Sequence, residues 1–193
     1  SKLSDEKEQG AIYHNSIKSL FGVSDVLSIC CPATKETENL INKENLGSQI
    51  TLLNSDYREI EGSFDKVVSI EMIEAVGSDY VPGFFEKASS LLKQNGLLSL
   101  QGITYNHPDF DTYKSSVDFI RKYIFPGSCL VSMPQIKSAI KENTDLTLID
   151  VEDITQHYAK TLSIWRQEFQ KTLPQVRELG FSESFIRIWE FYL

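Results

Sequence analysis

The chain has 193 residues, of which 41% are hydrophobic and 24% charged, and its formal net charge is −8. This composition is typical of a globular protein and excludes disordered and collagen-like chains. An acidic chain lacks the basic face that phosphate neutralisation requires, so we expect no nucleic-acid partner. No apolar run is long enough to span a bilayer or has the pattern of a signal peptide. Three cysteines, two of them adjacent, predict no disulfide framework and favour a reducing, cytoplasmic location.

Short apolar runs alternate with amphipathic stretches along the chain. The runs are apolar on both faces, which is typical of parallel strands covered by helices on both sides. They predict strands at 25–29, 50–54, 66–70, 97–101 and 146–151. The amphipathic stretches predict helices at 34–45, 79–93, 155–171, 174–180 and 182–192.

The stretch at 79–93 has the clearest helical pattern. Ser78 or Asp79 is predicted to cap its start, Pro82 lies in its first turn and Gly96 follows its end. Its predicted apolar stripe consists of Tyr80, Phe84, Phe85, Ala88, Leu91 and Leu92.

Strand–helix alternation predicts an α/β fold with a doubly wound, mostly parallel sheet and right-handed crossovers. We expect a single domain over 1–193, with helical cap elements at about 105–141 and 155–193. Ligands of such sheets bind at the carboxyl ends of the strands. The candidate site residues at these ends are Ile29, Cys30 and Cys31, then Asp56 and Tyr57, then Glu71 and Glu74, then Gln101 and Ile103, and finally Asp153, His157 and Tyr158.

Four blocks of the sequence resemble, in order, signatures of the cyclopropane-fatty-acyl-phospholipid synthases. They read FDKVVSIEMIEAVG at 64–77, KYIFPG at 122–127, HYAKTLSIW at 157–165 and FIRIWEFYL at 185–193. Ordered blocks of this kind are far more specific than a lone glycine motif. The resemblance implies an S-adenosylmethionine-dependent methyltransferase of class I, with a Rossmann-like fold. It covers about 48–193 well and the first 47 residues poorly.

The resemblance implies methyl transfer from S-adenosylmethionine to a cis double bond in a phospholipid acyl chain. A carbocation then forms, and loss of a proton to a bound bicarbonate closes a cyclopropane ring. By position, Glu74 matches the glutamate that helps to hold bicarbonate, Ile103 a backbone contact and Tyr158 a phenol donor. Gln101 stands where many members have histidine, and its amide can also donate to an oxyanion. The alternatives are a helix-cap or surface carboxylate for Glu74 and a core tyrosine for Tyr158.

Five residues are predicted to contact the cofactor: Ile29, Cys30, Asp56, Tyr57 and Glu71. Asp56 suits the adenine amino group because a carboxylate accepts hydrogen bonds, although a turn or cap aspartate is an alternative. No metal site is expected, since no Cys or His pairs have ligand spacing.

The segment Ser28 to Thr34 departs from the family pattern. It has no glycine where the family carries a glycine-rich cofactor turn, and Pro32 removes a backbone donor. Between Ile29 and Ile50 there is room for one helix, whereas the family pattern needs two helices and a strand. The resemblance also implies further segments at both ends. A sequence joined across a gap, a shortened chain and a diverged homologue that no longer binds the cofactor all remain open.

The predicted partners follow from the same resemblance. They are an unsaturated phospholipid or acyl chain and, peripherally, the membrane, and the sequence is compatible with a homodimer. Two other functions remain open: a non-catalytic homologue that binds lipid or a partner protein, and a methyltransferase that acts on a small amine.

Overall fold

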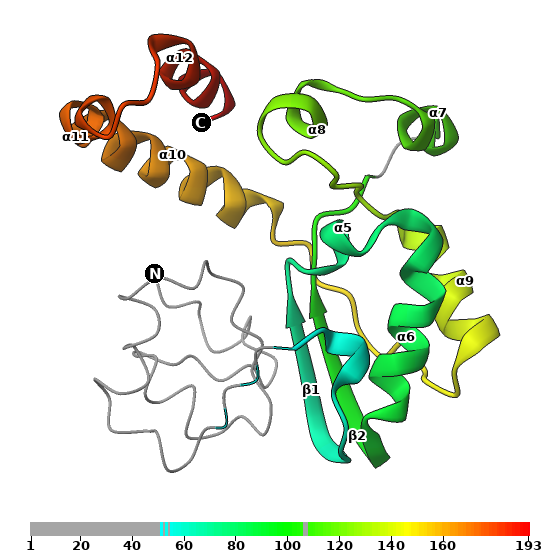
Figure 1. The fold of residues 1–193 in the computed structure, drawn as a ribbon. Coiled ribbons are helices and arrows are strands. Elements are labelled where there is room, and N and C mark those ends of the chain that lie inside the picture. The colour runs from blue at the N-terminus through cyan, green and yellow to red at the C-terminus, as the bar shows by residue number, and fades with distance from the viewer. Residues whose placement is uncertain (1–50, 52, 54, 106–107) are drawn as a thin grey trace. The chain divides into compact units, whose positions relative to one another are not determined.

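The computed structural model describes residues 51, 53, 55–105 and 108–193. The chain folds as two compact units (Figure 1). We call the unit that contains Gly83–Gly102 and the chain up to Ile73 the sheet unit. The helical unit consists of Glu74–Pro82 and Ile103–Leu193. The chain crosses between the two units three times, and the single domain over 1–193 stays a prediction.

The sheet unit is built around a parallel strand pair with a helical crossover. Strand β1 (Phe64–Ile70) pairs with β2 (Leu92–Gln101), and helix α6 (Val81–Ser90) connects them (Figure 1). A short 3-10 helix, η1 (Tyr57–Glu59), precedes β1. Both strands contain a predicted strand, at 66–70 and 97–101, but each begins earlier in the chain. The parallel pairing confirms the predicted type of sheet.

One face of α6 supplies most of the core of this unit. Phe84, Phe85 and Ala88 of α6, and Leu91 just after the helix, are all less than 10% exposed, which confirms the predicted stripe at these positions. Tyr80 was placed wrongly on that stripe, because it is 66% exposed and lies in the 3-10 helix η2 (Ser78–Tyr80) rather than in α6.

The start and end of α6 also differ from the prediction. Gly77, not Ser78 or Asp79, is the N-cap of η2, because both predicted capping side chains bond to other helices. Pro82 is in the first turn of α6, as predicted. Gly96 does not follow the helix directly but lies within β2, where a bulge separates the register pairs Phe64↔Leu92 and Lys66↔Leu97.

The predicted strand at 146–151 is wrong. In the part of the chain that the structure describes, the segment belongs to no strand, and Ile149 is 80% exposed. Its backbone N–H groups at Leu146 and Val151 donate to the nearby side chains of Thr144 and Asp150 instead of to a neighbouring strand. Local side-chain hydrogen bonds therefore replace a sheet ladder here. Of the expected strand at 50–54, Thr51 and Leu53 are described and are not in a strand. The predicted strand at 25–29 and helix at 34–45 lie outside the described residues.

The helical unit contains helices in both ranges predicted as cap elements, and their role as a cap stays a prediction. Three helices lie in its first part: α7 (Phe110–Ser115), α8 (Phe119–Tyr123) and α9 (Met133–Asn143). Three more follow: α10 (Thr155–Lys171), α11 (Leu173–Glu178) and α12 (Glu183–Tyr192). These last three agree with the predicted helices to within about a turn. A four-residue helix, α5 (Ile73–Val76), opens the unit at its junction with β1.

The core of the helical unit surrounds an isolated parallel bridge between Thr104 and Val131. Val131 is fully buried, and its carbonyl accepts from the Tyr105 N–H at 2.8 Å. The ring of Tyr105 stacks on that of Tyr113 at 4.2 Å between centroids. Within the described part of the chain, no helix is sufficiently long and apolar to cross a membrane.

Candidate active site

Glu74 and Ile103, two residues predicted for the same site, are joined by a hydrogen bond. Glu74 lies in α5, just after the carboxyl end of β1, and is only 9% exposed. Its Oε1 accepts from the backbone N–H of Ile103 at 2.5 Å. A buried carboxylate needs such donors, and a bond to a charged acceptor is stronger than one between neutral groups. The structure therefore brings together residues 29 positions apart in the sequence.

The backbone of Glu74 is held as well. Its carbonyl accepts from the N–H of Cys129 at 2.8 Å. Cys129 is itself buried and belongs to the loop between α8 and α9. The Glu74 side chain and main chain are thus each fixed by a segment far along the chain.

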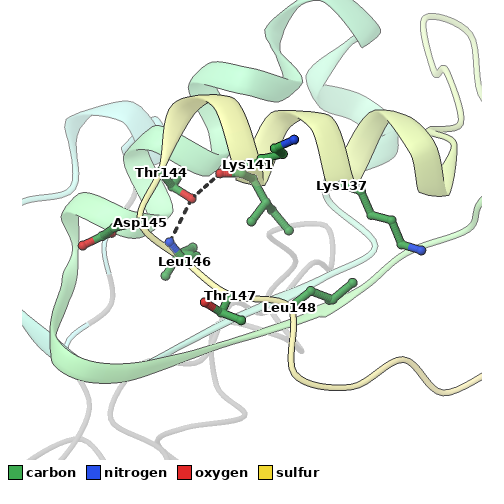
Figure 2. A pocket seen from close by; sticks show the side chains of 8 residues that line it. Lys137, Lys141, Thr144, Asp145, Leu146, Thr147 and Leu148 are labelled. Atoms are coloured by element: carbon green, nitrogen blue, oxygen red, sulfur yellow. Dashed lines mark hydrogen bonds between the residues drawn. The ribbon is translucent and has the colours of Figure 1, made fainter.

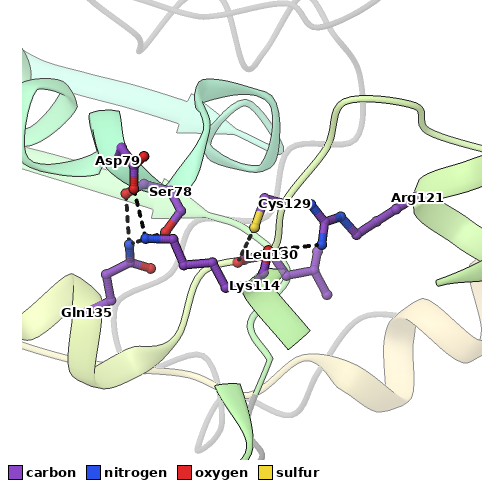
Figure 3. A network of polar contacts seen from close by, with 7 residues as sticks. All are labelled: Ser78, Asp79, Lys114, Arg121, Cys129, Leu130 and Gln135. Carbon is purple, nitrogen blue, oxygen red and sulfur yellow. Dashed lines mark hydrogen bonds and ion pairs between the residues drawn. The ribbon is translucent and has the colours of Figure 1, made fainter. Parts of the chain in front are cut away.

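The turn after Glu74 is tied to two helices of the same unit (Figure 3). Gln135 of α9 donates through Nε2 to both the carbonyl and the hydroxyl oxygen of Ser78, each at 2.9 Å. Lys114 of α7 pairs with Asp79 at 2.7 Å, and this hydrogen bond raises the pKa of the lysine. Ser78 is buried, so its contacts with Gln135 restrict the turn more than the exposed ion pair does.

Arg121 organises the loop that carries Cys129 (Figure 3). Its guanidinium donates to three nearby backbone carbonyls, those of Ser128 at 2.9 Å, Tyr113 at 3.0 Å and Ser116, and to a more distant one, that of Lys114 at 3.5 Å. The Tyr113 hydroxyl in turn accepts from the Leu130 N–H at 3.1 Å, and burial raises the pKa of this phenol. One planar side chain with several fixed donors can join segments in this way.

The sequence did not single out Gln135, Lys114 or Arg121. Each acts over five or more positions, and a lone polar residue on a helix carries no periodic signal. Arg121 directly precedes the block at 122–127 that resembles the family, and this was the one available indication.

Glu71 and Gln101 form a second pair, in the sheet unit. They lie at the carboxyl ends of the two parallel strands, where Ile70 is in register with Gln101. The Glu71 N–H donates to the Gln101 carbonyl at 2.9 Å, and Gln101 Nε2 donates to Glu71 Oε1 at 3.2 Å. Glu71 has a φ of 49°, in the left-handed region that non-glycine residues rarely adopt.

Asp56 and Tyr57, predicted to contact the cofactor, have structural partners. Asp56 is the N-cap of η1 and forms a 2.6 Å ion pair with Arg58. The hydrogen bond from the Arg58 side chain is the main cause that lowers the pKa of Asp56 to about 2. Tyr57 is half-buried against the ring of Phe84, 5.9 Å away between centroids, and burial raises its pKa. The cap geometry is the alternative that the sequence left open for Asp56, and a cofactor contact stays a prediction.

Tyr158 lies near the start of α10 and is half-buried. Its ring meets that of Trp165 edge-on, with centroids 6.4 Å apart. That Glu74, Gln101 and Tyr158 line one cavity stays a prediction. Ile29 and Cys30, the remaining predicted cofactor contacts, lie outside the described residues, as does Cys31.

Two hollows occur elsewhere in the described part. A groove of about 330 Å³ lies between α9 and the extended chain after it, lined by Lys137, Ile140, Lys141 and residues 144–148 (Figure 2). The Thr144 hydroxyl holds this chain to the helix end, because it donates to the Ile140 carbonyl and accepts from the Leu146 N–H. A smaller apolar cavity of about 90 Å³ lies between η1, β1 and α6. Tyr57 lines the smaller cavity, and none of the other predicted site residues lines either hollow.

Solved structures with the same architecture define the class of protein. Mycolic acid cyclopropane synthase CmaA1, complexed with SAH and CTAB, is 29% identical with a TM-score of 0.63, over 72% of this chain and 52% of that chain. The cyclopropane synthase MmaA2 from Mycobacterium tuberculosis has a TM-score of 0.66 over 82% of this chain and 60% of that chain. Its identity of 21% makes it evidence for the fold alone. The chain has the α/β fold of the class I methyltransferases, as predicted.

Residues 10–193 match the family described as mycolic acid cyclopropane synthetase, and the chain belongs to this family. Tuberculostearic acid methyltransferase UfaA1 of M. tuberculosis is 37% identical over 147 residues, which are 76% of this chain and 34% of that protein. Cyclopropane-fatty-acyl-phospholipid synthase of Escherichia coli K12 is 29% identical over 170 residues, 88% of this chain and 42% of that protein. The chain therefore spans less than half the length of these curated relatives. The resemblance drawn from the four sequence blocks is confirmed.

Proposed function

We propose that this chain belongs to an S-adenosylmethionine-dependent enzyme that modifies double bonds in the acyl chains of lipids, with unsaturated phospholipid as the substrate. The observation that carries the proposal is the buried hydrogen bond between Glu74 and Ile103. Family membership and the names of the relatives, which include lipid methyltransferases and cyclopropane synthases, support it.

We propose that a small oxyanion such as bicarbonate binds beside Glu74. The Ile103 N–H donates to Glu74 Oε1 in the described structure, and in the proposed complex a bicarbonate oxygen replaces that carboxylate oxygen as its acceptor. The amide of Gln101 and the phenol of Tyr158 are further donors, and Glu74 can orient or share a proton with its partner. We propose that Glu74 and Ile103 hold bicarbonate, which supplies a base for the proton lost from the acyl chain, and that Gln101 and Tyr158 take part in the same reaction as donors.

The described residues also leave a place for a donor at Asp56. An ionised carboxylate has about four acceptor positions. Arg58 uses three of them through its backbone N–H, Nε and Nη2. We propose that the remaining position receives the adenine amino group, while Tyr57 packs alongside. When bound, S-adenosylmethionine supplies the electrophilic methyl group.

Replacement of Glu74 by glutamine in the full protein tests this assignment. The amide keeps the size of the side chain but removes the charge, so we expect loss of methylated or cyclopropanated lipid without loss of the fold. The assay is mass spectrometry of unsaturated phospholipid after incubation with S-adenosylmethionine. Glu86→Gln, on the exposed side of α6, is the matched control. Unchanged product from Glu74→Gln would refute the role of Glu74, and transfer to small amines but not to lipid would favour the amine methyltransferase.

The same assay distinguishes the two lipid products. After methyl transfer, loss of a proton from the new methyl group closes a ring, whereas loss of a proton from a chain carbon leaves a methyl branch beside a double bond, so fragmentation of the product decides between them. In a buffer free of both carbon dioxide and bicarbonate, the reaction is expected to be slower than with added bicarbonate. Full activity in that buffer would contradict bicarbonate as the base.

A further inference from the structure

We propose that Glu71 is a positioning residue, which fixes the direction of the Gln101 side-chain amide for the reaction proposed above; the inference rests on that proposed function. Two hydrogen bonds join these residues, one between their main chains and one between their side chains. Both residues belong to the sheet unit, at the end of the strands where ligands of parallel sheets bind. This role differs from the cofactor contact that the sequence predicts for Glu71.

The backbone shows that Glu71 is held in place. Its φ of 49° is unfavourable for a residue with a side chain and persists only where surrounding contacts maintain it. The 2.9 Å bond from Glu71 N–H to the Gln101 carbonyl is such a contact, because it continues the β1–β2 ladder by one step. This turn directs the Glu71 carboxylate toward the neighbouring strand rather than along its own.

The side-chain bond determines which end of the amide faces outward. An ionised carboxylate can only accept, whereas an amide both donates and accepts. Gln101 must therefore turn its Nε2 to Glu71, at 3.2 Å, and its oxygen and second N–H then point in fixed directions. Without Glu71, rotation about the last side-chain bond would exchange donor and acceptor. The Gln101 amide is proposed to donate to an oxyanion, so its NH2 group and not its oxygen must face that oxyanion.

A double-mutant cycle on the full protein tests whether Glu71 acts through Gln101. We expect Glu71→Ala to lower kcat about two- to tenfold with little change in the KM for lipid, because the amide still occupies the site but in mixed orientations. Glu71→Gln offers Gln101 a donor as well as an acceptor, so it does not fix the direction of the amide and is expected to lose activity as Glu71→Ala does. Glu61→Ala, an exposed acidic residue before β1, is the matched control and is expected to change nothing.

The decisive comparison uses the Gln101→Ala background. If Glu71 works by orienting the amide, adding Glu71→Ala to Gln101→Ala has no further effect on kcat. An equal loss in both backgrounds would show that Glu71 acts on its own, for example on the cofactor, and would overturn the proposal.

A spectroscopic measurement separates this proposal from the proposed reaction. The side-chain NH2 signals of Gln101, identified by their loss in Gln101→Ala, should shift in Glu71→Ala and not in Glu61→Ala in 15N-resolved NMR spectra. If wild type methylates no lipid, the proposed function fails, and the NMR signals still decide whether Glu71 orients the amide. Unmoved signals in Glu71→Ala would overturn the positioning role whatever the activity.

Discussion

Arg121→Lys is the substitution expected to affect the stability of the helical unit most clearly. The guanidinium donates from Nε to the Ser128 carbonyl and from Nη1 to the carbonyls of Tyr113 and Ser116. These acceptors belong to segments on both sides of α8. A lysine keeps the charge but presents one compact group, so it cannot reach all three carbonyls together.

The size of the effect follows from the contacts that are lost. A hydrogen bond that involves a charged group contributes about 1.5–3 kcal/mol, and we expect two of the three to be lost. The Arg121 side chain is only half-buried, so water partly replaces them. The guanidinium also lies 5.4 Å from the Tyr113 ring, an interaction of about 0.5–1 kcal/mol. Together these contributions predict a destabilisation of about 2–4 kcal/mol.

Urea unfolding, followed by tryptophan fluorescence and far-UV circular dichroism, measures the difference in free energy of unfolding. Arg166→Lys is the control, because Arg166 is exposed on α10 and the substitution is expected to change little. An Arg121→Lys variant within about 0.5 kcal/mol of wild type would refute the view that this guanidinium holds the loop together.

Two further predictions concern the sheet unit. Gly96→Ala is expected to destabilise this unit by about 1–3 kcal/mol. An added Cβ would lie 2.9 Å from the Lys93 carbonyl oxygen and 3.2 Å from the Asp65 carbonyl oxygen, and neither backbone group can move aside easily. A thermal unfolding midpoint equal to that of wild type would contradict this reason. For Asp56, the folded-state pKa of about 2 lies below the ordinary value of 3.8, so its pairing with Arg58 stabilises the fold above about pH 4 and is lost as the pH falls toward 2. Asp56→Asn should therefore be less stable than wild type near neutral pH, and the difference should close on acidification. A difference in unfolding midpoint that stayed constant with pH would show that the charge of Asp56 is not its cause.

Local patterns explain most of the correct predictions from the sequence. The helix predicted at 155–171 matches α10 because its apolar spacing is a local signal, and in the structure Asp153 accepts from the Thr155 N–H at its start. Hydrogen bonding to Thr155 lowers the pKa of this aspartate. The strand at 66–70 was predictable for the same kind of reason, since a continuous apolar run needs no distant partner to be recognised.

The errors occur where the neighbour of a segment decides its structure. Residues 146–151 have a strand-like composition, but a strand requires a paired edge, and in the described structure the N–H groups at the two ends of the segment, Leu146 and Val151, bond locally. Tyr80 has helical spacing relative to Phe84, yet a 3-10 turn begins at Ser78 and rotates its ring into solvent. The apolar pattern of the sequence alone indicates neither whether a strand finds a neighbour to pair with nor where a 3-10 turn begins.

By itself, the amino-acid order determined the α/β class, the family and the identity of Glu74, Gln101, Ile103 and Tyr158 as candidates, since these depend on local pattern and on residue type. Only the tertiary structure decided which candidates bond to one another: Glu74 with Ile103, and Glu71 with Gln101. The physical reason is that each of these bonds joins groups some 30 positions apart. Such contacts form only after the crossover through α6 has brought the ends of two parallel strands together.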